Sequence, residues 1–144
     1  MALDLRFLPE IPDGMRIWYA DEEVAGISYR IKYAREFAKG RNLEIKLVRE
    51  PRNRHDGNDI RVLGIYKGWF FTRSVHIGYV TAEIAKAIVK SGSFDELQPR
   101  LKNIWWGGYV RDFIVVRFDI LQPKPAREVA TPKPKKRKPK QTDS

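Results

Sequence analysis

The stretch L-V-R-E-P-R-N-R-H-D-G-N-D-I-R-V, residues 47–62, holds the end of one predicted strand, a polar turn and the start of the next strand. The turn interleaves five hydrogen-bonding side chains with four arginines: Asn53, His55, Asp56, Asn58 and Asp59, with Arg49, Arg52, Arg54 and Arg61. Connecting segments on a rigid scaffold are where binding groups concentrate. This turn is therefore the first candidate for a functional site.

Alternation of apolar and polar residues continues on both sides of the turn. In residues 43–48, Leu43, Ile45 and Leu47 share one face, as expected for a half-buried strand. The first predicted strand has an apolar face that includes Tyr29, and the last two strands are joined by a hairpin turn at Gly107-Gly108. In all, the alternation of apolar and polar residues predicts six strands, at residues 23–31, 43–48, 59–66, 76–80, 96–106 and 110–121.

A single helix is predicted, at residues 81–92. Thr81 is a suitable N-cap, Ile84, Ala85 and Ile88 form an apolar stripe, and Gly92 is suited to the residue after the last turn. Residues 32–41 are expected to be a charged connection.

The predicted fold class is mainly β with one helix. Several short strands around one helix favour a small OB-like six-stranded barrel, because closure removes exposed sheet edges. An α+β two-layer sheet is the alternative. The predicted organisation is an N-terminal arm (1–22), the barrel domain (23–121) and a disordered Lys/Pro-rich tail (122–144), whose composition cannot bury enough apolar surface to offset its ordering entropy.

The chain is strongly basic, with 28 Lys and Arg against 18 Asp and Glu and a formal net charge of +10. Eight basic and two acidic residues in the tail give it a net charge of +6, which leaves +4 on the rest. This balance favours a polyanionic partner and predicts a local anion site with a separate electrostatic arm.

The absence of cysteine excludes disulfides and cysteine-based zinc sites, and His55 and His76 are the only histidines. No secretory signal or apolar run of about 18 residues is present, so no membrane helix is expected. The expected location is the cytoplasm, at the nucleoid in a bacterium, or the nucleus in a eukaryote.

Three motifs together carry a family resemblance. They are V-A-G-I-S-Y-R at 24–30, the P-x-N-x-x-D-x-N segment at 51–58, and H-I-G-Y-V-T-A-E-I-A at 76–85. In this order and spacing they resemble the HIRAN domain, which occurs at the N-terminus of helicase-like fork-remodelling ATPases and as stand-alone bacterial proteins. The resemblance covers residues 23–121 and implies an OB-like barrel that captures the 3′ end of single-stranded DNA.

The resemblance also implies roles for individual residues. By position, Asp56 resembles the aspartate that contacts the terminal 3′-hydroxyl, and His55 the ring beside the end nucleotide. Tyr29, Asn53 and Tyr79 match further motif positions, and Arg30 and Arg54 complete the candidate nucleic-acid-binding set. Two residues depart from the family pattern. Ser28 stands where eukaryotic members have a basic residue, and Asp59 stands where the family usually has alanine.

Each assignment has a structural alternative. An ionised Asp56 can accept a hydrogen bond from a 3′-hydroxyl and repels a 3′-phosphate, but Asp56-Gly57 is also typical of a turn whose carboxylate bonds its own backbone. Tyr29 can pack in the core or stack on a base. Trp69, Phe70 and Phe71, beside Arg73, either extend a stacking surface or pack in the core and across the hairpin.

We therefore expect a nucleic-acid-binding module for the 3′-hydroxyl end of single-stranded DNA, a role in DNA repair, and added non-specific affinity from the basic tail. No catalytic residue, metal or cofactor is expected, and no membrane partner. A monomer is expected, with a helicase or nuclease acting in trans. The alternatives are an adaptor whose tail alone binds nucleic acid and, less favoured, a metal-dependent nuclease.

Overall fold

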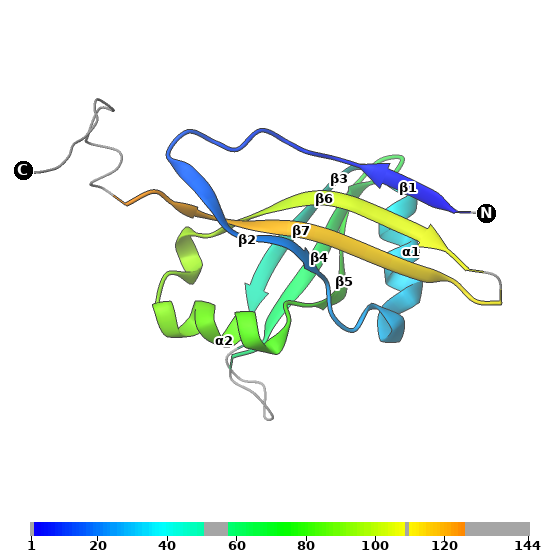
Figure 1. Ribbon diagram of the computed structural model, residues 1–144. Coiled ribbons are helices and arrows are strands. Elements are labelled where there is room, and N and C mark those ends of the chain that lie inside the picture. The colour runs from blue at the N-terminus through cyan, green and yellow to red at the C-terminus, as the bar shows by residue number, and fades with distance from the viewer. Residues whose placement is uncertain (1, 51–57, 109, 126–144) are drawn as a thin grey trace, which may run out of the picture.

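The computed structural model describes residues 2–50, 58–108 and 110–125, which form two antiparallel sheets (Figure 1). The four-stranded sheet has the order β1-β6-β7-β2, and the three-stranded sheet has the order β3-β4-β5. The strands are β1 (Leu3–Arg6), β2 (Met15–Glu23), β3 (Arg41–Arg49), β4 (Ile60–Lys67), β5 (Thr72–Tyr79), β6 (Gln98–Gly107) and β7 (Phe113–Pro123). The mainly β prediction is confirmed.

The N-terminal residues expected to form an arm instead supply two strands of the four-stranded sheet. β1 pairs with β6, with Leu3 opposite Trp106, and β2 pairs with β7, with Met15 opposite Pro123. The last strand therefore runs beyond the predicted end at residue 121. The Lys124 amide donates to the Gly14 carbonyl at 2.8 Å and closes this end of the sheet.

The three-stranded sheet contains the strand ends on either side of the polar turn, β3 up to Arg49 and β4 from Ile60. β3 and β4 pair with Leu47 opposite Val62, and β4 and β5 pair with Val62 opposite Gly78. Among the described residues, neither edge of this sheet pairs with an edge strand of the other sheet, so the predicted six-stranded barrel is not closed. Both sheets instead cover one hydrophobic core.

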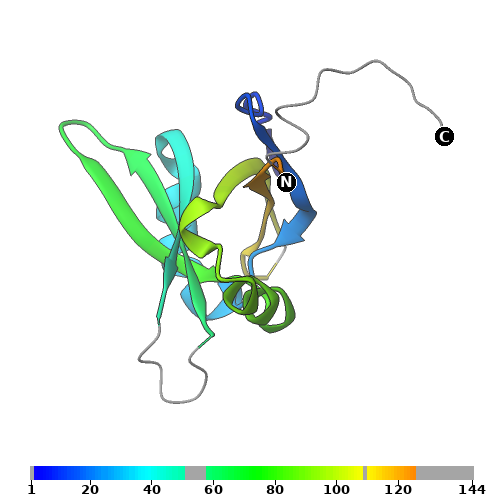
Figure 2. The ribbon, with the colours of Figure 1, turned by 90° about the vertical axis from the view of Figure 1, so that its left-hand side faces the viewer.

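That core draws on both sheets. Val62 and Ile77 from the three-stranded sheet and Ile104, Val116 and Phe118 from the four-stranded sheet are fully buried and belong to one cluster. Figure 2 shows the two sheets facing each other, with β4 and β5 forming a long hairpin that projects from the body. Burial of these side chains, at roughly 1.5–3 kcal/mol each, holds the sheets together without edge pairing.

The predicted strand at residues 23–31 is wrong. β2 ends at Glu23, Gly26 adopts a left-handed backbone (φ 77°), and Ile27–Arg30 form a 3-10 turn, η1, that leads into helix α1 (Ile31–Lys39). The left-handed Gly26, followed at once by a 3-10 turn, directs the chain away from the strand. The predicted charged connection at 32–41 is mostly this helix, whose buried face consists of Ala34, Phe37 and Ala38.

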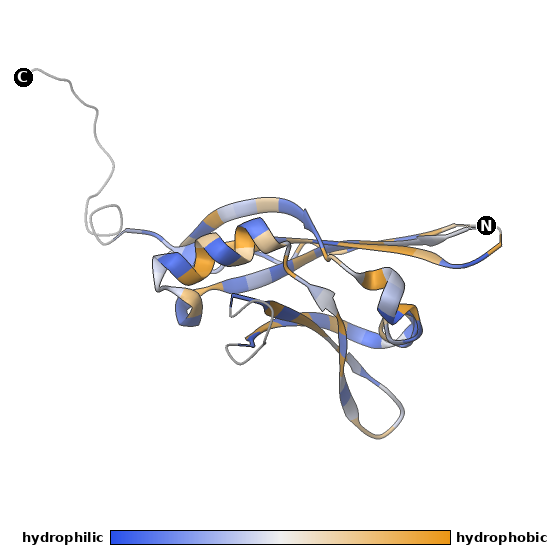
Figure 3. Ribbon diagram, turned by 90° about the horizontal axis from the view of Figure 1, so that it is seen from below, coloured by the Kyte–Doolittle hydropathy of each residue, from blue (hydrophilic) through white to orange (hydrophobic). Residues whose placement is uncertain are grey.

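Helix α2 (Ala82–Ser91) confirms the predicted helix. Thr81 and Gly92 flank it, Gly92 has the left-handed conformation expected after a helix (φ 73°), and Ala85 and Ile88 are buried. Figure 3 shows hydrophilic and hydrophobic residues alternating around α2. α1 and α2 lie at opposite ends of the paired sheets (Figure 1). A second 3-10 turn, η2 (Phe94–Glu96), links α2 to β6.

None of the helices in the described part of the chain is long and apolar enough to span a membrane.

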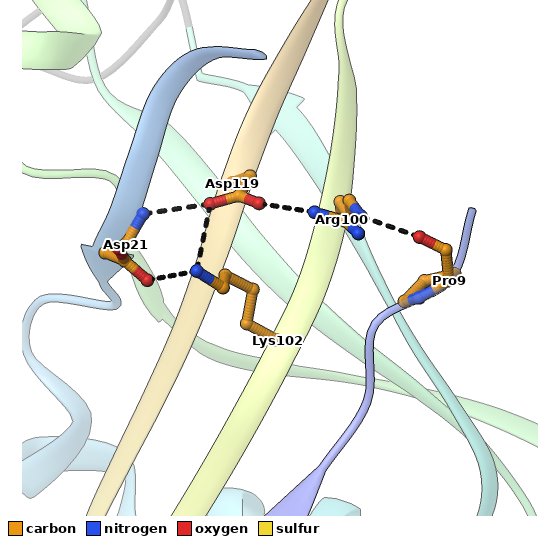
Figure 4. Close-up of polar contacts among 5 residues, drawn as sticks. All are labelled: Pro9, Asp21, Arg100, Lys102 and Asp119. Carbon is orange, nitrogen blue, oxygen red and sulfur yellow. Dashed lines mark hydrogen bonds and ion pairs between the residues drawn. The ribbon is translucent and has the colours of Figure 1, made fainter. Parts of the chain in front are cut away.

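A buried carboxylate ties the first and last parts of the chain together. Asp119 in β7 has no exposed surface, although the alternation of the strand places it on the face opposite Phe118. Its two oxygens accept from the Asp21 amide and from Arg100, both at 2.9 Å, and Lys102 lies 3.8 Å away (Figure 4). Arg100 also donates to the Pro9 carbonyl at 2.7 Å. A buried charge is tolerated only when partners of this kind satisfy it.

Candidate nucleic-acid interface

Two of the family-like motifs meet at a backbone bridge between Ala25 and Tyr79. The Ala25 amide donates to the Tyr79 carbonyl at 2.7 Å, and the Tyr79 amide donates to the Ala25 carbonyl at 2.9 Å. This pair of bonds fixes the segment after β2 against the end of β5. Because Arg61 lies opposite Tyr79 in β4, the bridge also places this segment beside the start of β4.

Gly78 makes this close approach possible. A Cβ atom at Gly78 would lie 2.4 Å from the Ala25 carbonyl oxygen and 2.5 Å from Cγ1 of Val24. Both distances are shorter than van der Waals contact, so a side chain would push the two segments apart. The glycine of the I-G-Y-V motif thus has a packing reason that the sequence alone did not provide.

Tyr29 projects from η1 into solvent. Its side chain is 92% exposed, whereas Ile27 in the same turn is buried. The Tyr29 amide donates to the Gly26 carbonyl at 3.1 Å, so the left-handed glycine sets the direction of the turn. The expectation that Tyr29 lies on an apolar strand face is therefore wrong. The exposed ring is available for stacking.

His76 joins Tyr79 in a ring pair that sequence reasoning did not assign to the site. The ring centroids are 4.8 Å apart and the planes are nearly perpendicular, at 80°. Nε2 of His76 lies 2.9 Å from the Gly78 carbonyl oxygen, which fits donation from an Nε2–H tautomer. His76 lies three residues before Tyr79 in β5, a spacing that was visible in the sequence. The register of β4 and β5 shifts between these two residues, which brings their rings within reach of each other.

The electrostatic surroundings of His76 identify its neighbours. Burial lowers the pKa of His76 below its ordinary value, and the positive charges of Arg30 and Arg61 lower it further. The Gly78 carbonyl and the negative charge of Glu50 act in the opposite direction. Arg30 and Arg61 therefore belong to the same positively charged surroundings, on the side of the molecule where η1, β4 and β5 meet.

The end of β3 and the start of β4, which the β3–β4 connection joins, lie beside Arg61. The Glu50 amide donates to the Asp59 carbonyl at 2.9 Å, and the Glu50 carboxylate forms an ion pair with Arg61. The residues 51–57 lie outside the described part of the chain. The predictions for Asn53, Arg54, His55 and Asp56 fall there.

The described part of the site thus combines an exposed aromatic ring with two guanidinium groups. Stacking rings and positive charges are what single-stranded nucleic acid requires, because every base has an aromatic face and every linkage a negative charge. Tyr29, Arg30 and Tyr79 from the predicted set come together here through the Ala25–Tyr79 bridge and His76. Across residues 2–50, 58–108 and 110–125, no group of three or more His, Asp or Glu residues is placed to hold a metal ion.

Comparison with known proteins gives one finding on the family. The family model described as HIRAN domain matches residues 19–93, more than half of the chain. The match includes all three motifs and ends just after α2, so it is shorter than the predicted range of 23–121. No curated protein and no solved structure matches the chain.

Proposed function

This chain belongs to the HIRAN domain family, which indicates nucleic-acid binding, and on that premise we propose that it recognises the 3′-hydroxyl end of single-stranded DNA. The observation that carries the proposal is the exposed Tyr29 ring, next to Arg30 in the turn that follows the Ala25–Tyr79 bridge. An exposed ring next to guanidinium groups suits a terminal nucleotide, which can stack on one face and place its phosphate beside the cations.

Asp56 supplies the proposed end recognition. An ionised carboxylate only accepts hydrogen bonds, so it accepts from a 3′-hydroxyl and repels a 3′-phosphate. Discrimination then comes from repulsion of the wrong end as well as attraction of the right one. His55 and Asn53 precede Asp56 in the same connection and are proposed as its neighbours at the end nucleotide, with Arg54 contacting phosphate.

The basic tail is proposed to add affinity without selectivity. Residues 126–144 contain seven Lys and Arg against two Asp and Glu. Cations that neutralise phosphates release counterions, and the resulting affinity falls as salt rises, regardless of sequence. The module itself is proposed to bind as a monomer without catalysing a reaction, and to bring DNA ends to a helicase or nuclease acting in trans during repair.

The test is a binding series with three DNA ligands of equal length and sequence. One has a free 3′-hydroxyl, one a 3′-phosphate, and one is circular and has no end. We expect the full chain to bind the first most tightly and Asp56→Asn to lose most of that preference. Asp59→Asn is the matched control, because it removes the same charge from the neighbouring strand end. Equal affinity for all three ligands would refute end recognition.

A second protein separates the tail from the folded part. A chain ending at Pro125 retains every described strand and the Lys124–Gly14 bond. We expect it to bind more weakly, with a smaller dependence on salt, and to keep the preference for the 3′-hydroxyl. Complete loss of binding would instead favour an adaptor whose tail alone holds nucleic acid.

A further inference from the structure

The turn between β4 and β5 exposes three consecutive aromatic residues. Trp69 is 86% exposed and Phe70 is 91% exposed, and more than half of Phe71 is accessible. The Trp69 and Phe70 ring centroids are 6.0 Å apart, with the planes inclined at 50°. The alternative of core packing is therefore wrong for Trp69 and Phe70. Contiguous apolar surface of this kind commonly marks a binding site.

The turn that carries these rings is held in a defined shape. The Gly68 amide donates to the Phe71 carbonyl at 2.8 Å, which closes a four-residue loop between Lys67 and Thr72. Arg41 donates to the Gly68 carbonyl at 2.9 Å and anchors the loop to the start of β3. A rigid presentation of exposed rings reduces the ordering cost when a ligand stacks on them.

Positive charge surrounds the rings. The Arg73 guanidinium lies over the Phe71 ring at 5.6 Å from its centroid. A pocket of about 560 Å³ beside Trp69 is bordered by three further cations, Lys39, Arg41 and Lys67, and by one carboxylate, Glu36. Glu36 accepts a hydrogen bond from the Tyr66 hydroxyl at 3.4 Å, and both residues border the pocket. Exposed rings among four cations are complementary to a polyanion that carries aromatic bases.

We infer that the β4–β5 turn, with the pocket beside Trp69, is a second contact for the same single-stranded nucleic acid, several nucleotides away from the end-binding site. The inference rests on the proposed function for the identity of the ligand. Bases stack on Trp69 and Phe70, and phosphates approach Lys39, Lys67 and Arg73. Figure 2 shows the turn projecting beyond the body, at the end of the hairpin opposite the start of β4.

The separation of the two contacts follows from the strands between them. Arg61 pairs with Tyr79 at one end of the hairpin and Lys67 pairs with Thr72 at the other. Six residues at about 3.3 Å each place the two ends roughly 20 Å apart. At about 3.4 Å per stacked nucleotide this corresponds to roughly six nucleotides, and to fewer when the strand is extended. A trinucleotide therefore reaches one contact only, whereas a strand of about 12 nucleotides reaches both, within the range of roughly 4–16 for single-strand-binding domains.

The experiment compares a trinucleotide with a strand of about 12 nucleotides, both of oligothymidine with a free 3′-hydroxyl, on the full chain. We expect Trp69→Ala with Phe70→Ala to weaken binding of the longer strand by at least roughly 5- to 150-fold, the effect expected for loss of a single stacked base, and to leave the trinucleotide unaffected. Trp69→Phe, which keeps a ring, should bind almost as the unmodified chain. Phe113→Ala is the control, since Phe113 is a 60% exposed aromatic residue in the other sheet.

The outcomes separate this inference from the proposed function. If the double variant binds the longer strand as tightly as the unmodified chain, the second contact is refuted, and the turn is then a candidate surface for a protein partner. If the double variant loses affinity for the longer strand while the chain shows no preference for a 3′-hydroxyl, the second contact stands and the end-recognition proposal fails. Failure of the unmodified chain to bind either strand would overturn both.

Discussion

Asp119 accepts the backbone N–H of Asp21 at 2.9 Å, across the boundary between β7 and β2. Asp21 has a left-handed backbone (φ 56°), which is unusual for a residue other than glycine, and it lies where the register of the two strands shifts. Such a bulge leaves an amide without a ladder partner. The Asp119 carboxylate takes that amide and fixes the bulge in β2, just before the segment that leads to Tyr29.

Replacement of Asp119 by alanine should strongly destabilise the protein. The change leaves Arg100, whose side chain is largely buried, without its carboxylate partner and leaves the Asp21 amide without an acceptor. Breaking a buried pair in this way costs about 3–5 kcal/mol. The free energy of unfolding, measured in urea by circular dichroism, should fall by that amount. Glu23→Gln removes an exposed ion pair with Arg117 and should cost about 1 kcal/mol or less. Equal effects of the two changes would contradict a special role for Asp119.

Gly78→Ala should destabilise the bridge between Ala25 and Tyr79. The added methyl group would meet the Ala25 carbonyl, which cannot move without breaking both bridge bonds. Overpacking of this kind costs about 1–3 kcal/mol, to be measured by chemical unfolding. Ser74→Ala, at an exposed position of the same strand, serves as the control and should change stability by about 0.5 kcal/mol or less. A neutral Gly78→Ala would show that the two motifs are not packed as described.

Tyr29→Ala should affect binding and not folding. Since the ring is almost fully exposed, its loss should change the free energy of unfolding by about 0.5 kcal/mol or less. Loss of a stacked base should weaken binding of a short 3′-hydroxyl strand by about 1–3 kcal/mol, measured by fluorescence anisotropy. Tyr29→Phe keeps the ring and should retain most of the affinity. A large loss of stability in Tyr29→Ala would indicate a packing role instead.

His76 should make stability decrease as the pH falls. Its pKa in the folded protein is lower than the ordinary value of 6.5, so below about pH 6.5 the unfolded chain binds a proton that the folded chain does not. The free energy of unfolding should therefore decrease as the pH falls through 6.5 and level off below the folded pKa. His76→Gln should lack this part of the pH dependence, measured by urea unfolding between about pH 5 and 8.

Arg30→Gln tests the cause of that shift. Removal of the Arg30 charge should raise the pKa of His76, while burial continues to hold it below 6.5. The histidine ring signals in an NMR titration report this directly, and His76→Gln identifies which signal belongs to His76. Lys86→Gln, an exposed change on α2, is the control. An unchanged His76 pKa in Arg30→Gln would mean that Arg30 does not face the site.

The sequence predicted those strands and the helix whose pattern of apolar residues is visible within the element itself. It missed the elements that depend on pairing with a strand far away in the chain. β3, β4, β5 and α2 were found because Leu43, Ile45 and Leu47 alternate and Ile84, Ala85 and Ile88 form a stripe. Residues 23–31 alternate equally well, but β2 ends at Glu23 and the left-handed Gly26 leads into a 3-10 turn, which alternation of apolar and polar residues does not reveal. β2 was missed because β7, about a hundred residues later, provides its pairing and Asp119 its bulge partner.

The segments that hold Tyr29 and Tyr79 lie side by side through the Ala25–Tyr79 bridge, and Tyr29 lies on a 3-10 turn instead of the predicted strand. His76, the first residue of the third motif, was not assigned to the site because its contact with the Tyr79 ring depends on the register shift between β4 and β5. The exposure of Trp69 and Phe70 could not be predicted either, since aromatic residues beside a turn are more often packed than exposed.

The hydrogen bond from the Val24 amide to the Val116 carbonyl, at 3.0 Å, crosses the limit of the family match. Residues 19–93 are recognisable by sequence, yet the part of β2 within that range pairs with β7, and buried Val116 and Phe118 complete its core. The recognisable region and the cooperative folding unit are therefore different lengths of chain. A fragment of residues 19–93 would lack β6 and β7 and would leave one face of its core open to water, so a transplanted domain should include the chain from β1 to Pro125.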